Sequence, residues 1–493
     1  MVGTDASLRD QARLIVIGPR NRARCPVGVA DRDRVTGGAG VGQPGNTSTG
    51  TFTHFTEFVP ARLKNESVTD GRAGGRRTGR GRRNRQTPGQ KEVRAGSAAG
   101  DTRRANFLEL FFDLVLVFAL SGVVSRVAPD LSADTFTRRW AGLLYVLVLV
   151  LPMMWLWTTT AHITSRFDPR RPAAQAMVLF TALGVVFMAS SLPYAFVARG
   201  YAFAVPYVVL QVGRPLFLIS LRRDRAQRAL YTRSAIWFTV SAVPWLAGIL
   251  AQGGSRVGLW ALAITIDLVA ARFSWPVPGM SRQSDSAWDP SKTHHLAARY
   301  EQLLLIALGE TVLSLGITYT NTPVSLVTTL AMVVGFATTV LLWRIYYYRA
   351  GQVLPEAVDS AGDRVRAGRN VGRAHVLMVL GIVLVATGYE IVVTHPGGHV
   401  RPAWLATILG GPIVFVIGRI GLERVVFNRV SPSRLIGIAA LTAVALPLAF
   451  TTPLIAAAVA LVVLLGMALA DARHAWGLPL EAPSPATARP KRG

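Results

Sequence analysis

Three polar side chains share one face of the first long apolar stretch of the chain. Asn106, Glu109 and Asp113 are three and four residues apart in the run R-A-N-F-L-E-L-F-F-D-L-V-L-V-F-A-L, so a helix presents them as one polar stripe. Ionisable groups inside a membrane are costly unless they are paired or hydrated, which makes them candidates for function. Two carboxylates one turn apart suit a proton or cation relay. Alternatively, both pair with arginines of neighbouring helices, for which Arg214 and Arg272 are available, and only specify packing.

Two further acids lie near the middle of predicted membrane helices. Asp267 stands in A-L-A-I-T-I-D-L-V-A, and Glu310 in L-L-L-I-A-L-G-E-T-V-L-S-L-G, too deep to reach water. Ser314 follows Glu310 by one turn on the same helix face. Glu390 stands closer to the outer end of its span, where water can hydrate it, and is therefore a secondary candidate.

Histidines offer a second kind of proton chemistry. His162 shares one face of its predicted helix with Trp155 and Thr159, where it could shuttle protons or be purely structural. His294 and His295 are adjacent, so on a helix they point about 100° apart and suit a single metal ion poorly. Metal-ligand spacings such as H-E-x-x-H, phosphate-binding glycine loops and nucleophile elbows are absent from the sequence. We therefore expect neither a metal nor a cofactor.

The composition indicates that membrane helices position these groups. Of the 493 residues 51% are hydrophobic and 16% charged, whereas soluble domains carry about 25% charged residues. A membrane helix needs about 20 mostly apolar residues. The sequence thus predicts an all-α polytopic transmembrane helix bundle of about twelve spans, near residues 105–125, 140–161, 173–197, 201–221, 233–251, 256–275, 296–319, 324–347, 373–394, 402–421, 434–449 and 452–471.

Three regions follow from this pattern: a tail over residues 1–102, a transmembrane domain over 103–475 and a short basic tail over 476–493. The first tail is rich in Arg and Gly and poor in apolar residues, which predicts disorder. It could contact anionic lipid or nucleic acid, or have no role. Met153 is the first methionine after Met1, so a shorter product would need another start codon, for which Val93 is a candidate. Most loop Lys and Arg fall on one side of the predicted bundle, which places both termini in the cytoplasm.

Four segments resemble the bacterial low temperature requirement A (LtrA) family. They are the run around Glu109 and Asp113, W-L-W-T-T-T-A-H-I-T-S-R-F-D-P at 155–169, W-A-L-A-I-T-I-D-L at 260–268 and H-L-A-A-R-Y-E-Q-L-L-L-I-A-L-G-E-T-V-L-S-L-G at 295–316. The resemblance implies a multi-pass protein of the bacterial cytoplasmic membrane without an established biochemical activity. Carried over by position, the motif acids are Glu109, Asp113, Asp267 and Glu310.

A secondary transporter or ion-conducting protein is the favoured hypothesis, with a proton, cation or small solute crossing the bilayer. Asp113, Asp267 and Glu310 would surround one site near the midplane, and Glu109 would act as a proton gate. One alternative is a membrane-embedded enzyme acting on lipid, with a headgroup-sized polar pocket near Glu109 and His162. Another is a non-catalytic membrane scaffold or sensor. The sequence favours transport over catalysis and leaves the oligomeric state open.

Overall fold

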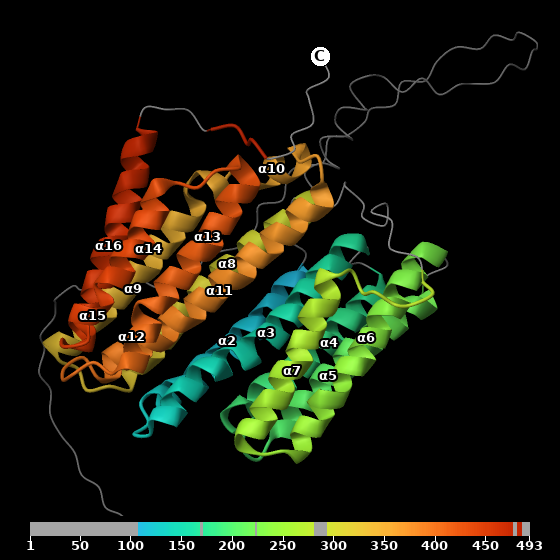
Figure 1. Ribbon diagram of the computed structural model, residues 1–493, viewed down its shortest axis with the longest axis horizontal. Helices are drawn as coiled ribbons and strands as arrows, with labels where there is room; N and C mark the ends of the chain where they lie inside the picture. The colour runs from blue at the N-terminus through green and yellow to red at the C-terminus, as the bar shows by residue number, and fades with distance from the viewer. Residues whose placement is uncertain (1–106, 168–170, 222–223, 281–292, 477–480, 486–493) are drawn as a thin grey trace, which may run out of the picture. The chain divides into compact units, whose positions relative to one another are not determined.

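Apolar runs of about twenty residues form helices because no other element satisfies every backbone hydrogen bond within one segment in lipid. The computed structural model describes residues 107–167, 171–221, 224–280, 293–476 and 481–485. Every long element in these ranges is an α-helix (Figure 1), which confirms the predicted all-α class. The predicted N-terminal tail and most of the C-terminal one lie outside the described residues.

The helices form two consecutive groups that pack against each other mainly through α2 and α3. In the first group, α2 lies against α3 and α4, α5 joins α4 to α6, and α6 packs on α7. These helices are α2 (Phe107–Leu131), α3 (Phe136–Arg166), α4 (Pro172–Ser191), the short η1 (Leu192–Tyr194), α5 (Gly200–Leu221), α6 (Arg225–Leu250) and α7 (Gly253–Arg272).

The second group surrounds α11, which contacts α8, α9, α13 and α16 and also reaches α2 and α3 of the first group. Its elements are α8 (Thr293–Thr320), α9 (Leu326–Tyr346), η4 (Tyr347–Gly351), α10 (Leu354–Ser360), α11 (Arg364–Thr394), α12 (Pro402–Ile408), α13 (Gly410–Phe427), α14 (Pro432–Ala443), α15 (Ala445–Leu448) and α16 (Pro453–Ala475).

Glycines allow α11 and α13 to approach closely. A Cβ atom added to Gly381 would lie 2.5 Å from the backbone nitrogen of Phe415, and one added to Gly418 would lie 2.7 Å from the carbonyl oxygen of Ala374. Backbone contacts of this kind are the usual source of helix association in membranes, where lipid removes the hydrophobic drive between helices.

Eleven helical segments of the described chain are long and apolar enough to cross a membrane. The predicted span 434–449 is instead divided into α14 and α15, because Pro447 lacks a backbone N–H and crowds the carbonyl of Ala443, four residues earlier. Helices α14 and α15 still connect the end of α13 to the loop before α16. In that loop, the Thr451 carbonyl accepts a hydrogen bond from the backbone N–H of Val400, which lies between α11 and α12. The structure therefore supports eleven of the predicted spans, and the twelfth, over 434–449, stays a prediction.

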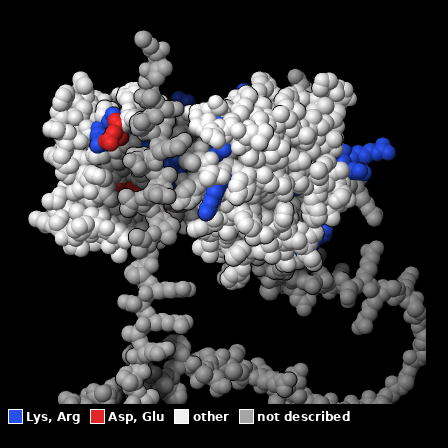
Figure 2. All heavy atoms as spheres, turned by 90° about the horizontal axis from the view of Figure 1, so that it is seen from below, with Lys and Arg blue, Asp and Glu red and all other residues white. Residues whose placement is uncertain are grey.

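Most of the face seen in Figure 2 carries neither Lys or Arg nor Asp or Glu. Helix α11 begins at Arg364, earlier than the predicted residue 373, because the Asp363 carboxylate accepts a hydrogen bond of 2.8 Å from the backbone of Arg366 and caps the helix.

Candidate functional site

Asp113 is held by a buried arginine of α8. Two guanidinium nitrogens of Arg299 donate to its carboxylate at 2.7 and 2.8 Å, and Trp157 Nε1 of α3 donates at 2.8 Å. Asp113 is 0% exposed and Arg299 2% exposed. Such a bidentate pair is a strong, geometrically specific contact, and it fastens α2 and α3 to α8.

Glu109 extends this pair toward the end of the bundle where α2 and α8 begin. Its carboxylate lies 4.0 Å from Arg299 Nε and 3.3 Å from His295 Nε2, and His295 is 24% exposed. The carboxylates of α2 therefore do pair with an arginine of a neighbouring helix, as one interpretation of the sequence expected. The arginine is Arg299, however, and not one of the two suggested from the sequence. Asn106, the third member of the predicted stripe, lies outside the described residues.

The two arginines suggested from the sequence lie elsewhere. Arg214 is buried in α5, where it donates to the carbonyls of Leu210 and Leu156 at 3.1 and 3.3 Å and to Thr160 Oγ1 at 3.1 Å. Arg272 is exposed at the end of α7, and its guanidinium lies 5.9 Å from the centre of the Phe273 ring. Neither therefore contacts the carboxylates of α2.

Glu310 occupies a second, separate cluster. It is 0% exposed, one carboxylate oxygen accepts a hydrogen bond from Ser121 of α2, and the other has no hydrogen-bond partner among the described residues. Glu390 of α11 is half-buried and close enough to interact with it electrostatically. Ser314 is half-buried one turn further along α8.

Asp267 forms the centre of a third cluster, between α5, α6 and α7. It is 2% exposed, and Tyr207 Oη and Gln211 Nε2 each donate to it over 3.4 Å, long for hydrogen bonds. Ser241 of α6 also faces this carboxylate. Gln211 in turn accepts a hydrogen bond of 3.4 Å from Arg214, so one amide links the buried acid to a buried arginine.

Asp113, Glu310 and Asp267 have separate sets of contacts among the described residues, and a single site around all three stays a prediction. Asp113 and Ser121, which binds Glu310, are eight residues apart on α2, or about 12 Å at 1.5 Å per residue. The contacts of Asp267 come from α5 and α6 and include neither α2 nor α8. Each cluster therefore has its own surroundings, and the three acids differ most in whether they face an arginine.

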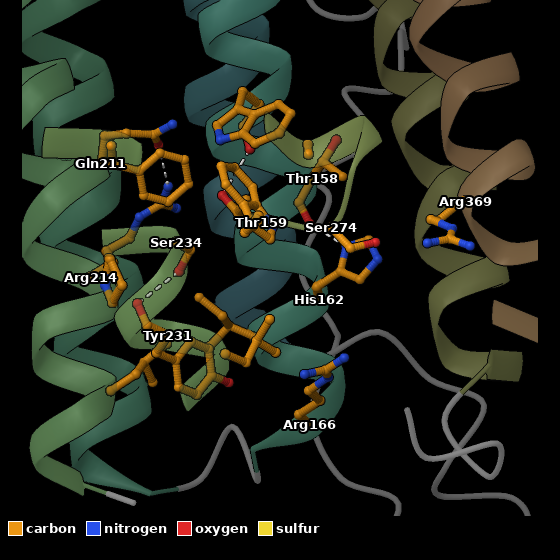
Figure 3. Close-up of a pocket in the computed structure, with 18 of the residues that line it drawn as sticks. Thr158, Thr159, His162, Arg166, Gln211, Arg214, Tyr231, Ser234, Ser274 and Arg369 are labelled. Carbon is orange, nitrogen blue, oxygen red and sulfur yellow. Dashed lines mark hydrogen bonds between the residues drawn. The ribbon is translucent and has the colours of Figure 1, made fainter. Parts of the chain in front are cut away.

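A cavity of about 320 Å³ lies beside the Asp267 cluster (Figure 3). Gln211 and Arg214 form part of its wall, and His162 lines it with Nδ1 2.7 Å from the Thr158 carbonyl. The lining comes from α3, α5, α6, the end of α7 and the start of α11 and comprises Trp155, Thr158, Thr159, His162, Ile163, Arg166, Gln211, Arg214, Pro215, Leu218, Leu230, Tyr231, Ser234, Phe238, Ala271, Ser274, Trp275, Val365 and Arg369.

Comparison with known proteins identifies the family to which the helix bundle belongs. Residues 104–469 match the family model of the bacterial low temperature requirement A protein. The chain belongs to the LtrA family. A relative from Rhizobium meliloti (strain 1021), described as an uncharacterized protein, is 33% identical over 350 residues, which are 70% of this chain and 83% of the relative. No solved structure matches the chain. This LtrA family member is accordingly a multi-pass membrane protein.

The LtrA bundle holds a further ion network that the sequence reasoning missed. Arg434 of α14 donates to Asp471 of α16 at 2.6 Å and lies 3.5 Å from Glu423 of α13. Arg419 lies 3.4 Å from Glu423 and donates to the Ile345 carbonyl at 2.9 Å. The signal was present in the sequence: Arg299 and Arg419 both interrupt apolar runs, and the argument applied to buried acids applies equally to them.

Proposed function

We propose that this LtrA family protein is a secondary transporter that moves a small solute through the cavity beside α5, with protonation of Asp267 coupled to solute binding. The observation that carries the proposal is the link from the cavity to Asp267. Gln211 and Arg214 line the cavity, and Gln211 donates to the buried carboxylate. A solute that engages these two side chains changes the surroundings of Asp267.

Asp267 suits a proton carrier better than Asp113 does. The described contacts of Asp267 are a phenol, an amide and a hydroxyl, which can accompany either a neutral or a charged carboxyl group. Asp113 instead faces a bidentate arginine, and neutralising it would leave that buried cation uncompensated. Proton exchange at Asp267 therefore disturbs the fold less.

The position of the cavity agrees with alternating access from the cytoplasm. It is built from the C-terminal ends of α3, α5 and α7 and the N-terminal ends of α6 and α11, which adjoin the Arg-rich loops predicted to be cytoplasmic. Secondary transporters commonly hold their substrate in such a cavity between helices that rock against one another.

A lipid-modifying enzyme is the second candidate, because the cavity is large enough for a headgroup and His162 lines it. Acid–base catalysis on a lipid headgroup usually needs a second positioned proton acceptor. No Asp or Glu stands among the described residues of the cavity wall. This difference favours transport over catalysis.

Purified protein in proteoliposomes containing a trapped pH dye tests the proposal. External sodium, potassium, benzenesulfonate, butylammonium and a neutral sugar are added in turn, and we expect one of them to drive proton movement. Asp267→Asn should abolish that movement yet retain solute exchange without a proton gradient. Asp134→Asn, an exposed acid in the loop after α2, is the matched control and should behave as wild type. Proton movement that survives in Asp267→Asn would refute the assigned role.

A further inference from the structure

We infer that the cavity beside α5 binds an organic monoanion with an apolar body. The inference names the substrate class and, as far as transport is concerned, rests on the proposed function. Three arginines and a histidine contribute to the wall, namely Arg166, Arg214, Arg369 and His162, whereas none of its described residues is acidic. A cavity with this charge attracts anions and repels cations.

The exposure of the basic side chains decreases from the mouth of the cavity to its inner end. Arg369 is exposed at the start of α11, Arg166 is half-buried at the end of α3, and Arg214 is 5% exposed. Figure 3 shows Arg369 and Arg214 on opposite sides of the cavity, with His162 between them. From Arg166 to Thr158 along α3, the helix rise gives a depth of about 12 Å. An anion can thus be drawn in at the mouth and held at Arg214.

An aromatic wall supplies the contact for an apolar body. Trp155, Phe238 and Trp275 come from three different segments and pack edge to face, with ring centres 4.8–6.3 Å apart. Because each ring is fixed by the other two, the wall is preorganised for a flat or chain-like group. A volume of about 320 Å³ lies within the range of small-molecule sites, about 300–1,000 Å³.

Charge balance explains why an anion and a proton would bind together. Arg214 donates to the same Gln211 amide that donates to Asp267, so an anion at Arg214 brings negative charge toward a buried carboxylate. An anion beside a charged Asp267 places two negative charges near each other inside the bundle, and a proton on Asp267 removes that repulsion. The groups facing Asp267 are Tyr207 and Gln211 from α5 and Ser241 from α6, and Arg214 contacts Gln211 rather than the carboxylate. Anion binding should therefore tighten when Asp267 is neutral.

Calorimetry with the full chain in phosphatidylcholine nanodiscs tests this inference. The probe is octanesulfonate, which stays charged at every pH used, so that any pH dependence belongs to the protein. Octyltrimethylammonium has a similar chain and the opposite charge. We expect the sulfonate to bind and the ammonium not to bind, and we expect sulfonate affinity to fall as the pH rises.

Three variants and one control assign the binding and its pH dependence to individual residues. Arg214→Gln should weaken sulfonate binding about tenfold or more, because it removes a charge-assisted contact. Arg369→Gln, at an exposed position that tolerates change, should weaken it several-fold even if Arg214→Gln fails to fold. Arg199→Gln, an exposed arginine before α5, is the matched control and should leave affinity unchanged. Asp267→Asn should bind the sulfonate more tightly at high pH and lose the pH dependence.

Equal binding of sulfonate and ammonium, or sulfonate affinity unchanged in both Arg214→Gln and Arg369→Gln, would overturn the inference. Nanodiscs that also contain phosphatidylglycerol identify the source of the anion. If phosphatidylglycerol abolishes sulfonate binding in the wild type but not in Arg369→Gln, the natural anion is an acidic lipid headgroup. If sulfonate binding is unchanged by phosphatidylglycerol, the natural anion is a free solute. Sulfonate binding without proton movement in proteoliposomes would refute transport and leave the anion site standing. Proton movement driven solely by other solutes would refute the anion site.

Discussion

Replacing Asp113 by Asn should destabilise the protein strongly, since Arg299 then loses its main counter-charge inside the bundle. The wild-type pair has two short hydrogen bonds, of 2.7 and 2.8 Å, and both side chains are almost fully buried. Removing one member of a buried ion pair costs about 3–5 kcal/mol. Because Glu109 stays 4.0 Å from Arg299 Nε, we expect the lower end of that range, about 3 kcal/mol.

Unfolding in mixed micelles of increasing SDS content, followed by circular dichroism, measures this loss in the free energy of unfolding. The double variant Asp113→Leu/Arg299→Met should recover most of the stability, because a well-packed apolar pair can replace a buried ion pair. Asp134→Asn, an exposed acid near Arg401, is the control and should unfold as wild type does. An Asp113→Asn protein as stable as wild type would show that Arg299 does not depend on this carboxylate, and the structural role assigned to the pair would be wrong.

Two other substitutions separate packing from chemistry. Gly381→Ala should lower the free energy of unfolding by about 1–3 kcal/mol, because its methyl group would lie 2.5 Å from the Phe415 backbone nitrogen. Gly421→Ala is the control and should leave the free energy of unfolding unchanged in the same SDS titration, because its methyl group would meet contacts of 3.5 Å or more. Glu310→Gln should unfold as wild type does, because its amide oxygen can still accept the hydrogen bond from Ser121. A loss of stability comparable to that of Asp113→Asn would contradict this expectation.

The sequence predicted the helices well because apolar run length is a local property. Boundaries were less accurate where a single side chain decides them. Asp363 caps α11 earlier than the apolar run begins, and Pro447 divides the span expected over 434–449. Both effects have a recognised local cause, a capping carboxylate and a proline ring. A hydropathy profile averages over many residues and therefore does not show where such a single residue starts or interrupts a helix.

Helix pairing was not predictable in the same way. The arginine opposite Asp113 stands 186 residues further along the chain, and no pattern within either helix identifies the other. The choice between Arg214, Arg272 and Arg299 depends on which helices are neighbours, a property of the assembled bundle. The cavity beside α5 combines five segments, so its basic lining could not be assembled from any one of them.

The contacts that the sequence could not show also decide how the buried acids should be interpreted. Asp113 accepts two hydrogen bonds from the Arg299 guanidinium, so its negative charge is needed for the stability of the fold. Asp267 and Glu310 face hydroxyl, phenol and amide groups, which accept either state of a carboxyl group. Neutralisation should therefore reduce the stability of the first and the function of the other two. This contrast would not arise if all three acids merely specified packing, because each substitution would then act on folding in the same direction.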